Sequence, residues 1–184
     1  MDFIAQAIGI VAMAANILAF QFKNKKTLII CQLMGSVLFA VNMFMLNAVM
    51  GGIMNILGIA RALVYLKKDD LKIPIKTVNI LFVFAYAIFY VMVFTVFGKE
   101  PTTTNIILEL LPAIGSSAMA LALSRNSTRA VRLCGFINSP CWLIYNSVNF
   151  SIGGILCEIF GLISVISSLI RIDILGKKNK KENS

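Results

Sequence analysis

Histidine is absent from this chain, and acidic residues are few: eight Asp and Glu stand against seventeen Lys and Arg. Histidine is the commonest general base and metal ligand in proteins, so its absence argues against the usual catalytic and metal sites. The sequence also has no paired carboxylates at helical spacing and no glycine-rich phosphate loop. We therefore expect no enzyme, no metal site and no other cofactor.

The four cysteines have no Cys-x-x-Cys spacing, which disfavours a zinc or redox motif. All of them lie inside apolar segments, which is not the pattern of a disulfide framework in a secreted protein. The simplest interpretation is that they are small, buried apolar side chains. They are Cys31, Cys134, Cys141 and Cys157.

Apolar residues dominate what is present, at 59% of the chain, with a mean hydropathy of +0.87. A soluble domain of 184 residues could not bury so much apolar surface around one core. The net charge of +9 does not indicate nucleic-acid binding, because the basic residues lie between apolar segments rather than along a stripe with aromatics. The composition indicates an integral membrane protein whose immediate partner is the lipid bilayer.

Seven apolar segments are each near the length that spans a bilayer as a helix. Asp2, rather than a basic residue, precedes the first segment, so we expect no signal peptide. The predicted fold class is an all-α membrane protein with seven transmembrane helices. The segments are Phe3 to Gln21, Leu28 to Leu46, Gly51 to Leu66, Val78 to Phe97, Asn105 to Leu123, Ala130 to Val148 and Ile152 to Ile172.

The charges between these segments predict the orientation. With seven spans, all basic residues except Lys99 and Arg61 fall on one side of the membrane. By the positive-inside rule that side is cytoplasmic, which places the N-terminus outside and the C-terminus inside. We expect a membrane protein that crosses the bilayer several times.

The first three segments resemble the last three at an offset of 103 residues, as in Cys31 with Cys134 and Gly58 with Gly161. A one-residue slip at the hairpin pairs Asn47 with Asn149. Because both triplets start outside, these are parallel repeats joined by the fourth segment, a 3+1+3 arrangement. The predicted units are a first three-helix bundle (1–66), a linker helix with its loops (67–104), a second three-helix bundle (105–175) and a lysine-rich cytoplasmic tail (176–184).

Four residues at equivalent repeat positions form the predicted binding site: Phe39 with Trp142, and Asn55 with Glu158. Each aromatic residue precedes its polar partner by sixteen residues. Facing one another across the repeat axis, they would offer a flat apolar surface and oriented polar groups to a small polar solute. The alternative is that Asn55 only bonds another helix and that Trp142 only packs.

Glu158 is the strongest of the four, because an ionisable residue at membrane depth is costly and seldom serves packing alone. Burial favours the protonated form of a carboxyl group, so Glu158 is also a candidate for proton coupling. Glu109, in the outer turn of its segment, would either sit at headgroup level or line an outer vestibule. Arg61 lies five residues before a cytoplasmic helix end and is expected to snorkel to the interface; pairing with Glu158 is the alternative.

The arrangement resembles the SWEET, SemiSWEET and PQ-loop superfamily. Three motifs are Leu110-Leu111-Pro112-Ala113-Ile114-Gly115, Cys141-Trp142-Leu143-Ile144-Tyr145-Asn146 and Ser151-Ile152-Gly153-Gly154 leading to Glu158. Through these motifs the chain more closely resembles the YgjV-type bacterial inner-membrane proteins, over nearly its whole length. The resemblance implies a location in the bacterial cytoplasmic (inner) membrane.

SWEET-type transporters hold sugar between a tryptophan pair and an asparagine pair, which maps by resemblance onto Phe39, Trp142, Asn55 and Glu158. Phenylalanine and glutamate depart from that pattern, and the glutamate favours a cationic or proton-coupled solute over a neutral sugar. The Pro-Gln signature is replaced by Phe20-Gln21 and Leu123-Ser124. By the same resemblance, Pro112 and Pro140 match hinge prolines.

Our first hypothesis is a facilitator or proton-coupled transporter for a small polar solute, opening alternately by rocking of two three-helix bundles. The alternative is a receptor or accessory subunit that binds a ligand or protein partner without moving it. A purely structural assembly protein is a third hypothesis. The sequence permits either a monomer or a homo-oligomer.

Overall fold

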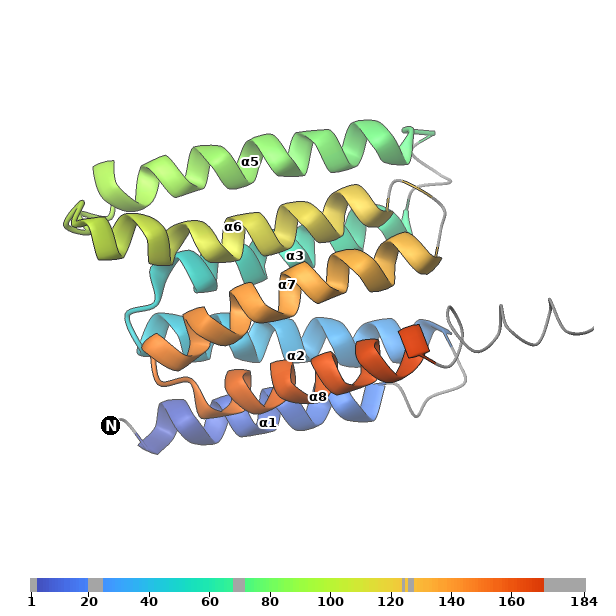
Figure 1. Cartoon of the computed structure of the whole chain (residues 1–184), viewed down its shortest axis with the longest axis horizontal. Helices are drawn as coiled ribbons and strands as arrows, with labels where there is room; N and C mark the ends of the chain where they lie inside the picture. Colours follow the sequence, from blue (N-terminus) through green and yellow to red (C-terminus); the bar gives the residue numbers. More distant parts are fainter. Residues whose placement is uncertain (1–2, 20–24, 68–71, 124, 126–127, 171–184) are drawn as a thin grey trace, which may run out of the picture.

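The structure is a computed structural model that describes residues 3–19, 25–67, 72–123, 125 and 128–170. These residues form seven α-helices and no strand (Figure 1). The predicted tail, 176–184, lies outside the described residues. The helices are α1 (Phe3–Ala19), α2 (Lys25–Met45), α3 (Val49–Leu66), α5 (Ile75–Thr95), α6 (Thr103–Leu123), α7 (Thr128–Val148) and α8 (Ile152–Ser168).

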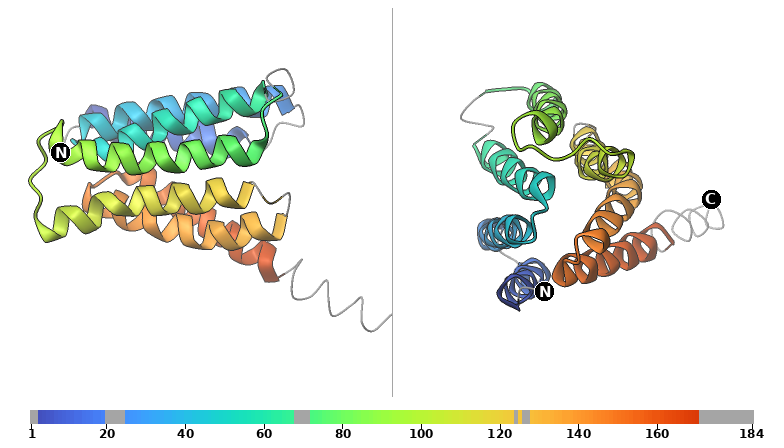
Figure 2. Two further views of the ribbon diagram at one scale, coloured as in Figure 1. Left: turned by 90° about the horizontal axis from the view of Figure 1, so that it is seen from above. Right: turned by 90° about the vertical axis from the view of Figure 1, so that its left-hand side faces the viewer.

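Successive helices run in opposite directions along one common axis (Figure 1). At one end, which we call the hairpin end, lie the first residue of α1 and the short α2–α3 and α7–α8 connections (Figure 2). At the other, the basic end, α1 and α3 finish, and the described cations Lys67, Lys72 and Arg125 lie in the loops there. Lys99 is in the α5–α6 loop at the hairpin end.

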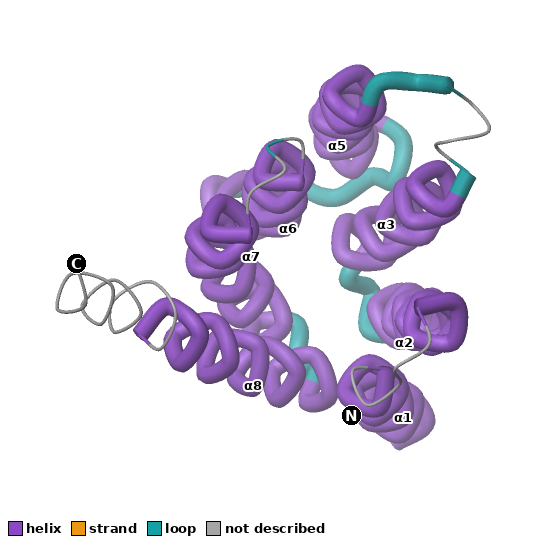
Figure 3. The backbone as a smooth tube through the Cα atoms, turned by 90° about the vertical axis from the view of Figure 1, so that its right-hand side faces the viewer, coloured by secondary structure: helices purple, strands orange, loops and turns teal. Residues whose placement is uncertain are grey.

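The helices form a closed circuit when viewed along their axis (Figure 3). Contacts link α1 to α2 and α2 to α3 on one side, and α6 to α7 and α7 to α8 on the other. The two sides meet where α1 packs on α8 and where α3 packs on α6, and α5 lies outside against α3 and α6. We call α1–α3 the first half and α6–α8 the second half.

The contact between α1 and α8 brings the two backbones together at a pair of glycines. A Cβ atom on Gly153 would lie 2.1 Å from the carbonyl oxygen of Gly9. Only glycine fits such an approach, because real Cβ atoms do not come this close to backbone atoms. This contact fixes the hairpin ends of the two halves against each other.

The α2–α3 and α7–α8 hairpins contain the same backbone hydrogen bonds, 103 residues apart. The N–H of Ala48 donates to the carbonyl of Met43 (2.8 Å), as the N–H of Ser151 donates to that of Asn146 (2.9 Å). Both bonds close a helix C-terminus in the Schellman manner, satisfying a carbonyl that the helix itself cannot. The two hairpins therefore end the preceding helix in the same way, whereas only the second begins the next helix with a side-chain cap, that of Ser151.

The residue with a left-handed backbone is Asn47 in the first hairpin (φ 56°) and Phe150 in the second (φ 54°). The prediction of a one-residue slip, pairing Asn47 with Asn149, is therefore wrong for the backbone, because the offset of 103 continues through the turn. Asparagine adopts a left-handed backbone readily, whereas phenylalanine does not. The Phe150 carbonyl accepts a hydrogen bond from the side chain of Gln6 (2.7 Å), which holds this turn in place.

The outer surface of the described helices is apolar, while several polar side chains are inside. Large apolar side chains are exposed on every helix; Phe84 on α5 and Phe160 on α8 are 64% and 53% exposed. Soluble proteins rarely expose apolar patches on such a scale, whereas lipid-facing helices require them. The buried polar residues are Gln6, Asn42, Asn79, Glu109, Ser116, Ser139, Asn146 and Ser151.

By length and composition, two of the described helical stretches are long and apolar enough to cross a membrane, Ile75–Thr95 and Thr103–Ala122. Four further apolar stretches are shorter: Phe3–Leu18, Ile30–Met45, Val49–Tyr65 and Ile152–Ser167. The all-helical fold with an apolar exterior is consistent with a membrane protein. Helix α7 is more polar than the other described helices, and its residues Asn138 and Asn146 line an interior cavity.

Candidate functional site

A cavity of about 230 Å³ lies between the two halves, and we call it the central cavity. The four residues of the predicted site, Phe39, Asn55, Trp142 and Glu158, all line it. They come from α2, α3, α7 and α8, so each half supplies one aromatic and one polar side chain. The fold thus brings together residues that the sequence repeat had paired.

The aromatic and amide groups of the cavity are held by contacts within their own halves. Trp142 packs edge-on against Tyr145, with ring centroids 6.0 Å apart and planes at 81°. The side-chain nitrogen of Asn55 donates to the carbonyl of Gly51 on its own helix (2.9 Å). Asn55 does not use that donor on another helix, and its side-chain oxygen makes no hydrogen bond to any residue that the structure describes.

Glu158 faces the central cavity from α8, beside Ser139 of α7. The Ser139 hydroxyl hydrogen-bonds to the Glu158 carboxyl group. Both lie beside Gly161: a Cβ there would be 3.5 Å from Ser139 Oγ and 4.0 Å from Glu158 Oε2. Within the described ranges no Lys or Arg lies within ion-pair distance of Glu158, so this carboxyl group meets only a neutral partner.

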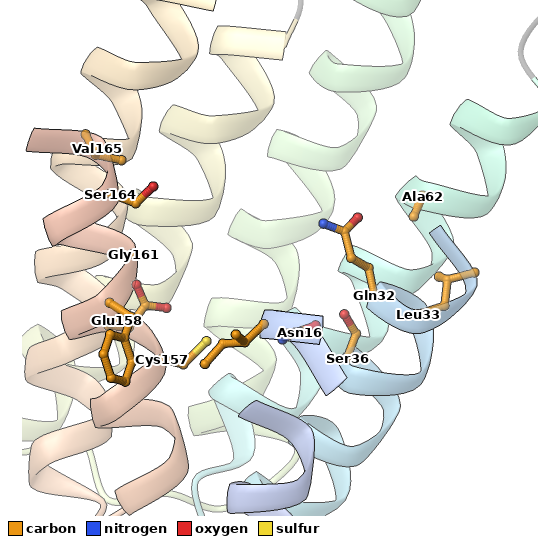
Figure 4. A pocket seen from close by; sticks show the side chains of 12 residues that line it. Asn16, Gln32, Leu33, Ser36, Ala62, Cys157, Glu158, Gly161, Ser164 and Val165 are labelled. Atoms are coloured by element: carbon orange, nitrogen blue, oxygen red, sulfur yellow. The ribbon is translucent and has the colours of Figure 1, made fainter. Parts of the chain in front are cut away.

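A second cavity of about 680 Å³, the inner cavity, adjoins the central cavity on the side of the basic end. The two cavities share Asn16, Ser36, Cys157 and Glu158. Figure 4 shows Glu158 and Ser164 on one side of the inner cavity, across from Ser36 and Asn16 on the other. Glu158 therefore stands at the junction between the central site and a wider space toward the end where α1 and α8 finish.

Arg61 also lines the central cavity, which differs from the expected snorkelling to the interface. Its Nη1 atom donates to the hydroxyl of Tyr86 on α5 (3.1 Å) and to the carbonyl of Ser116 on α6 (3.5 Å). These two acceptors on other helices draw the guanidinium inward. It forms no ion pair with Glu158 in the structure, so the alternative expectation is not met either.

Glu109 lies near the hairpin end, where its carboxylate meets two other side chains. It accepts from the hydroxyl of Tyr145 (3.1 Å) and forms an ion pair with Lys99. The Tyr145 hydroxyl in turn accepts from the backbone N–H of Gly51, in the first turn of α3 (3.0 Å). Glu109 is 0% exposed, so it does not line an open outer vestibule as the sequence had suggested.

A second set of hydrogen bonds joins α1 and α2 to the α7–α8 hairpin. The side chain of Gln6 donates to the Phe150 carbonyl and accepts from the N–H of Ile152 (3.0 Å). Asn42 donates to the carbonyl of Ala5 (2.7 Å) and accepts from the hydroxyl of Ser151 (2.7 Å). We call both sets together the hairpin-end network, and most of its bonds connect one half to the other.

The two predicted hinge prolines lie inside helices, Pro112 in α6 and Pro140 in α7. A proline in a helix interior leaves the carbonyl four residues earlier without its usual partner, so each position is a point where the helix can bend. Neither proline lines the central cavity, but Ser116 and Trp142 follow them closely on the same helices and do. Their role as hinges stays a prediction.

The sequence matches the profile of a family described as bacterial inner membrane protein (Imp-YgjV), over residues 3–175. The chain belongs to the YgjV family. No curated protein and no solved structure matches it.

Membership of the YgjV family accounts for the apolar exterior, because it places the protein in the inner membrane of bacteria. A buried polar lining inside such a shell is then shielded from lipid by the helices themselves. Among the described residues of the YgjV-family chain, no three Cys, Asp or Glu side chains gather as metal ligands would.

Sequence reasoning missed several residues of the central cavity, notably Asn138, Asn146 and the inward position of Arg61. One signal was available: Asn138, Trp142 and Asn146 are spaced by four residues and so lie along one face of α7. No such signal existed for Arg61, because its direction depends on Tyr86 and Ser116 of other helices.

Proposed function

We propose that the protein transports a small polar solute across the inner membrane through the central cavity. The observation that carries this proposal is that both halves contribute to one polar cavity, which adjoins a larger cavity at the basic end. A volume of about 230 Å³ is below the roughly 300–1,000 Å³ of pockets for drug-sized ligands, which suits a small solute.

In this proposal the chain spans the membrane seven times as two parallel three-helix repeats, with α5 as the linker helix. The matching hydrogen bonds of the two hairpins support the repeat. So do the two interfaces between the halves, since α1 on α8 and α3 on α6 exchange places when the halves are interchanged. The basic end is then cytoplasmic, and the N-terminus lies outside.

The described conformation corresponds to the state that is closed to the outside. The hairpin-end network and the Gly9–Gly153 contact hold the halves together on the outer side. The inner cavity provides the route from the cytoplasm to the site. Transport then requires the opposite state, in which the halves separate at the hairpin end and close at the basic end, with bending at Pro112 and Pro140.

The free-energy difference between the two states depends on the hairpin-end network. A net gain of about 0.5–1.5 kcal/mol for each hydrogen bond between the halves amounts to several kcal/mol in favour of the closed outer end. A solute shifts the equilibrium only by the difference between its affinities for the two states. Glu158, at the junction of the two cavities, is the residue we assign to solute binding and to any proton exchange.

The direct test is solute flux into proteoliposomes, which is monitored by light scattering. The vesicles shrink when solute is added outside and swell again as the solute enters. This assay needs no labelled substrate, so polyols, sugars, amino acids and quaternary amines can be compared. We expect at least one class to enter faster than in protein-free vesicles, and Trp142→Ala to abolish the difference. Phe84→Ala is the matched control, because Phe84 is on the outer surface of α5.

Two results would contradict transport. If no solute enters faster than in protein-free vesicles, the proposal fails. If a solute stabilises the purified protein to saturation yet never enters sealed vesicles, the protein is a receptor or accessory subunit that binds without moving its ligand.

A further inference from the structure

The central cavity is lined by one basic and one acidic side chain, Arg61 on α3 and Glu158 on α8. The inner cavity adds no further Lys, Arg, Asp or Glu to its described lining. Each of the two groups is bonded only to neutral partners: Arg61 to Tyr86 and the Ser116 carbonyl, Glu158 to a serine hydroxyl. In the described part of the chain, neither meets an opposite charge.

A guanidinium and a carboxyl group that line one cavity without a charged partner are both stabilised by a ligand that carries the opposite charges. We propose that the substrate of this site is a small zwitterion, with its ammonium group at Glu158 and its carboxylate at Arg61. The inference rests on the proposed function and names the substrate class of the same site.

Other solute classes leave one or both charges without compensation. A neutral polyol satisfies neither charge, a simple cation leaves Arg61 unpaired, and a simple anion leaves Glu158 unpaired. A zwitterion matches both while adding no net charge to the membrane interior. Arg61 uses only Nη1 in its described bonds, so the rest of its planar fork is available for the two oxygens of a carboxylate.

The remaining lining suits the ammonium end of such a ligand. Asn55 and Asn146 line the same cavity and bring polar amide groups to it. Trp142 adds an aromatic ring, which attracts cations including methylated ammonium groups.

The two charges belong to different halves, which connects binding to movement. Arg61 is in the first half and Glu158 in the second. A ligand that bonds both draws α3 and α8 toward each other, beyond what either charge alone could do. The zwitterion therefore stabilises the state in which the basic end closes around it, which is the step that transport requires after loading from the cytoplasm.

The test is thermal stability of the purified full-length protein in detergent with matched probes. One set is L-alanine, L-alaninamide (cation only) and N-acetyl-L-alanine (anion only); a second is glycine betaine and choline; glycerol and xylitol are the neutral probes. A zwitterion at about 100 times its Kd should raise Tm by about 5 °C or more. We expect the single-charge and neutral probes to bind at least about tenfold more weakly.

Variants of Arg61 and Glu158 test which residue binds the carboxylate of the zwitterion and which binds its ammonium group. Arg61→Gln should remove the preference for L-alanine over L-alaninamide, and Arg61→Lys should keep part of that preference. Glu158→Gln should remove the preference for L-alanine over N-acetyl-L-alanine. Lys67→Gln, at the exposed end of the same helix, and Glu100→Gln, in an exposed loop, are matched controls and should change neither preference. Melting without ligand shows whether each variant is folded.

The outcomes separate this inference from the proposed function. Stabilisation by zwitterions, lost in the charge variants, supports both. Stabilisation by polyols or by choline alone, dependent on Trp142, overturns the zwitterion inference and leaves the site in place. Stabilisation by no probe at all, in a folded protein, overturns both.

Discussion

The hairpin-end network gives the sharpest single prediction, through the hydroxyl of Tyr145. This one oxygen donates to buried Glu109 and accepts from the N–H of Gly51, and so joins the second half to the first. Tyr145→Phe removes both bonds and changes little else, because Tyr145 is 0% exposed and its ring still fills the same space.

The magnitude follows from the two partners. A hydrogen bond to a charged group contributes about 1.5–3 kcal/mol and a neutral one about 0.5–1.5 kcal/mol, so the pair contributes roughly 2–4.5 kcal/mol to the free energy of unfolding. The bond to Glu109 lies within the second half and survives separation of the halves, so only the bond to Gly51, about 0.5–1.5 kcal/mol, depends on a closed outer end. Its loss shifts the equilibrium toward the outward-open state by roughly 2-fold to 10-fold.

The assay is the rate at which a membrane-impermeant maleimide, added outside, labels Met43→Cys in a variant without the native cysteines. Met43 is 1% exposed and lies beneath the network, where its sulfur is 3.0 Å from the position of a Cβ on Gly51. We expect slow labelling in this background and roughly 2-fold to 10-fold faster labelling after Tyr145→Phe.

Tyr90→Phe is the matched control, because the Tyr90 hydroxyl donates to the Ile106 carbonyl (3.0 Å) and joins α5 to α6 without crossing between the halves. It should leave the labelling rate unchanged. If Tyr145→Phe lowers Tm by several degrees but does not change labelling from outside, the two bonds are purely structural and the gating argument is refuted.

Three further predictions concern single positions. Gly153→Ala should lower the free energy of unfolding by about 2 kcal/mol or more, because its Cβ would meet the Gly9 carbonyl. A Cβ at Gly58 has nothing within 4 Å, so Gly58→Ala should be neutral or stabilising by up to about 1 kcal/mol. Equal Tm values for the two variants would contradict the close contact. Ser151→Ala should cost about 1–2 kcal/mol, since it removes the N-cap acceptor of α8 for Gly154 N–H and the bond to Asn42; an unchanged Tm would refute this. Glu158→Gln should abolish any difference in solute entry between mildly acidic and mildly basic pH, and a difference that survives would place proton coupling elsewhere.

The sequence predicted the helices well, because apolar runs of this length have few other structures available to them. The boundaries moved by a few residues where helices extend into polar first turns, as α2 does at Lys25 and α6 at Thr103. Hydropathy marks the part of a helix that needs lipid, whereas backbone hydrogen bonds decide where the helix begins.

The hairpin shows where side-chain similarity misleads. Aligning Asn47 with Asn149 matched identical residues, yet the left-handed position in the second turn is Phe150. A phenylalanine there carries no local signal for such a backbone, and the bond from Gln6, far away in the sequence, secures it.

The gathering of the four predicted residues around one cavity could be anticipated because the predicted repeat pairs them. The network of Glu109, Tyr145 and Lys99 could not, since it depends on how α6, α7 and the α5–α6 loop pack. Nor could the direction of Arg61, whose long side chain reaches either the interface or the interior from the same backbone position.

The central claim is that one site is reached alternately from the two faces of the membrane. The most direct measurement is the labelling of Asn55→Cys, without the native cysteines, by an impermeant maleimide from each side of sealed vesicles. We predict fast labelling of this cysteine from the cytoplasmic side and slower labelling from outside, which Tyr145→Phe accelerates. Once the cysteine has been fully labelled from one side, no further label should be taken up from the other. Labelling from a single side only, unchanged by Tyr145→Phe, would contradict alternating access.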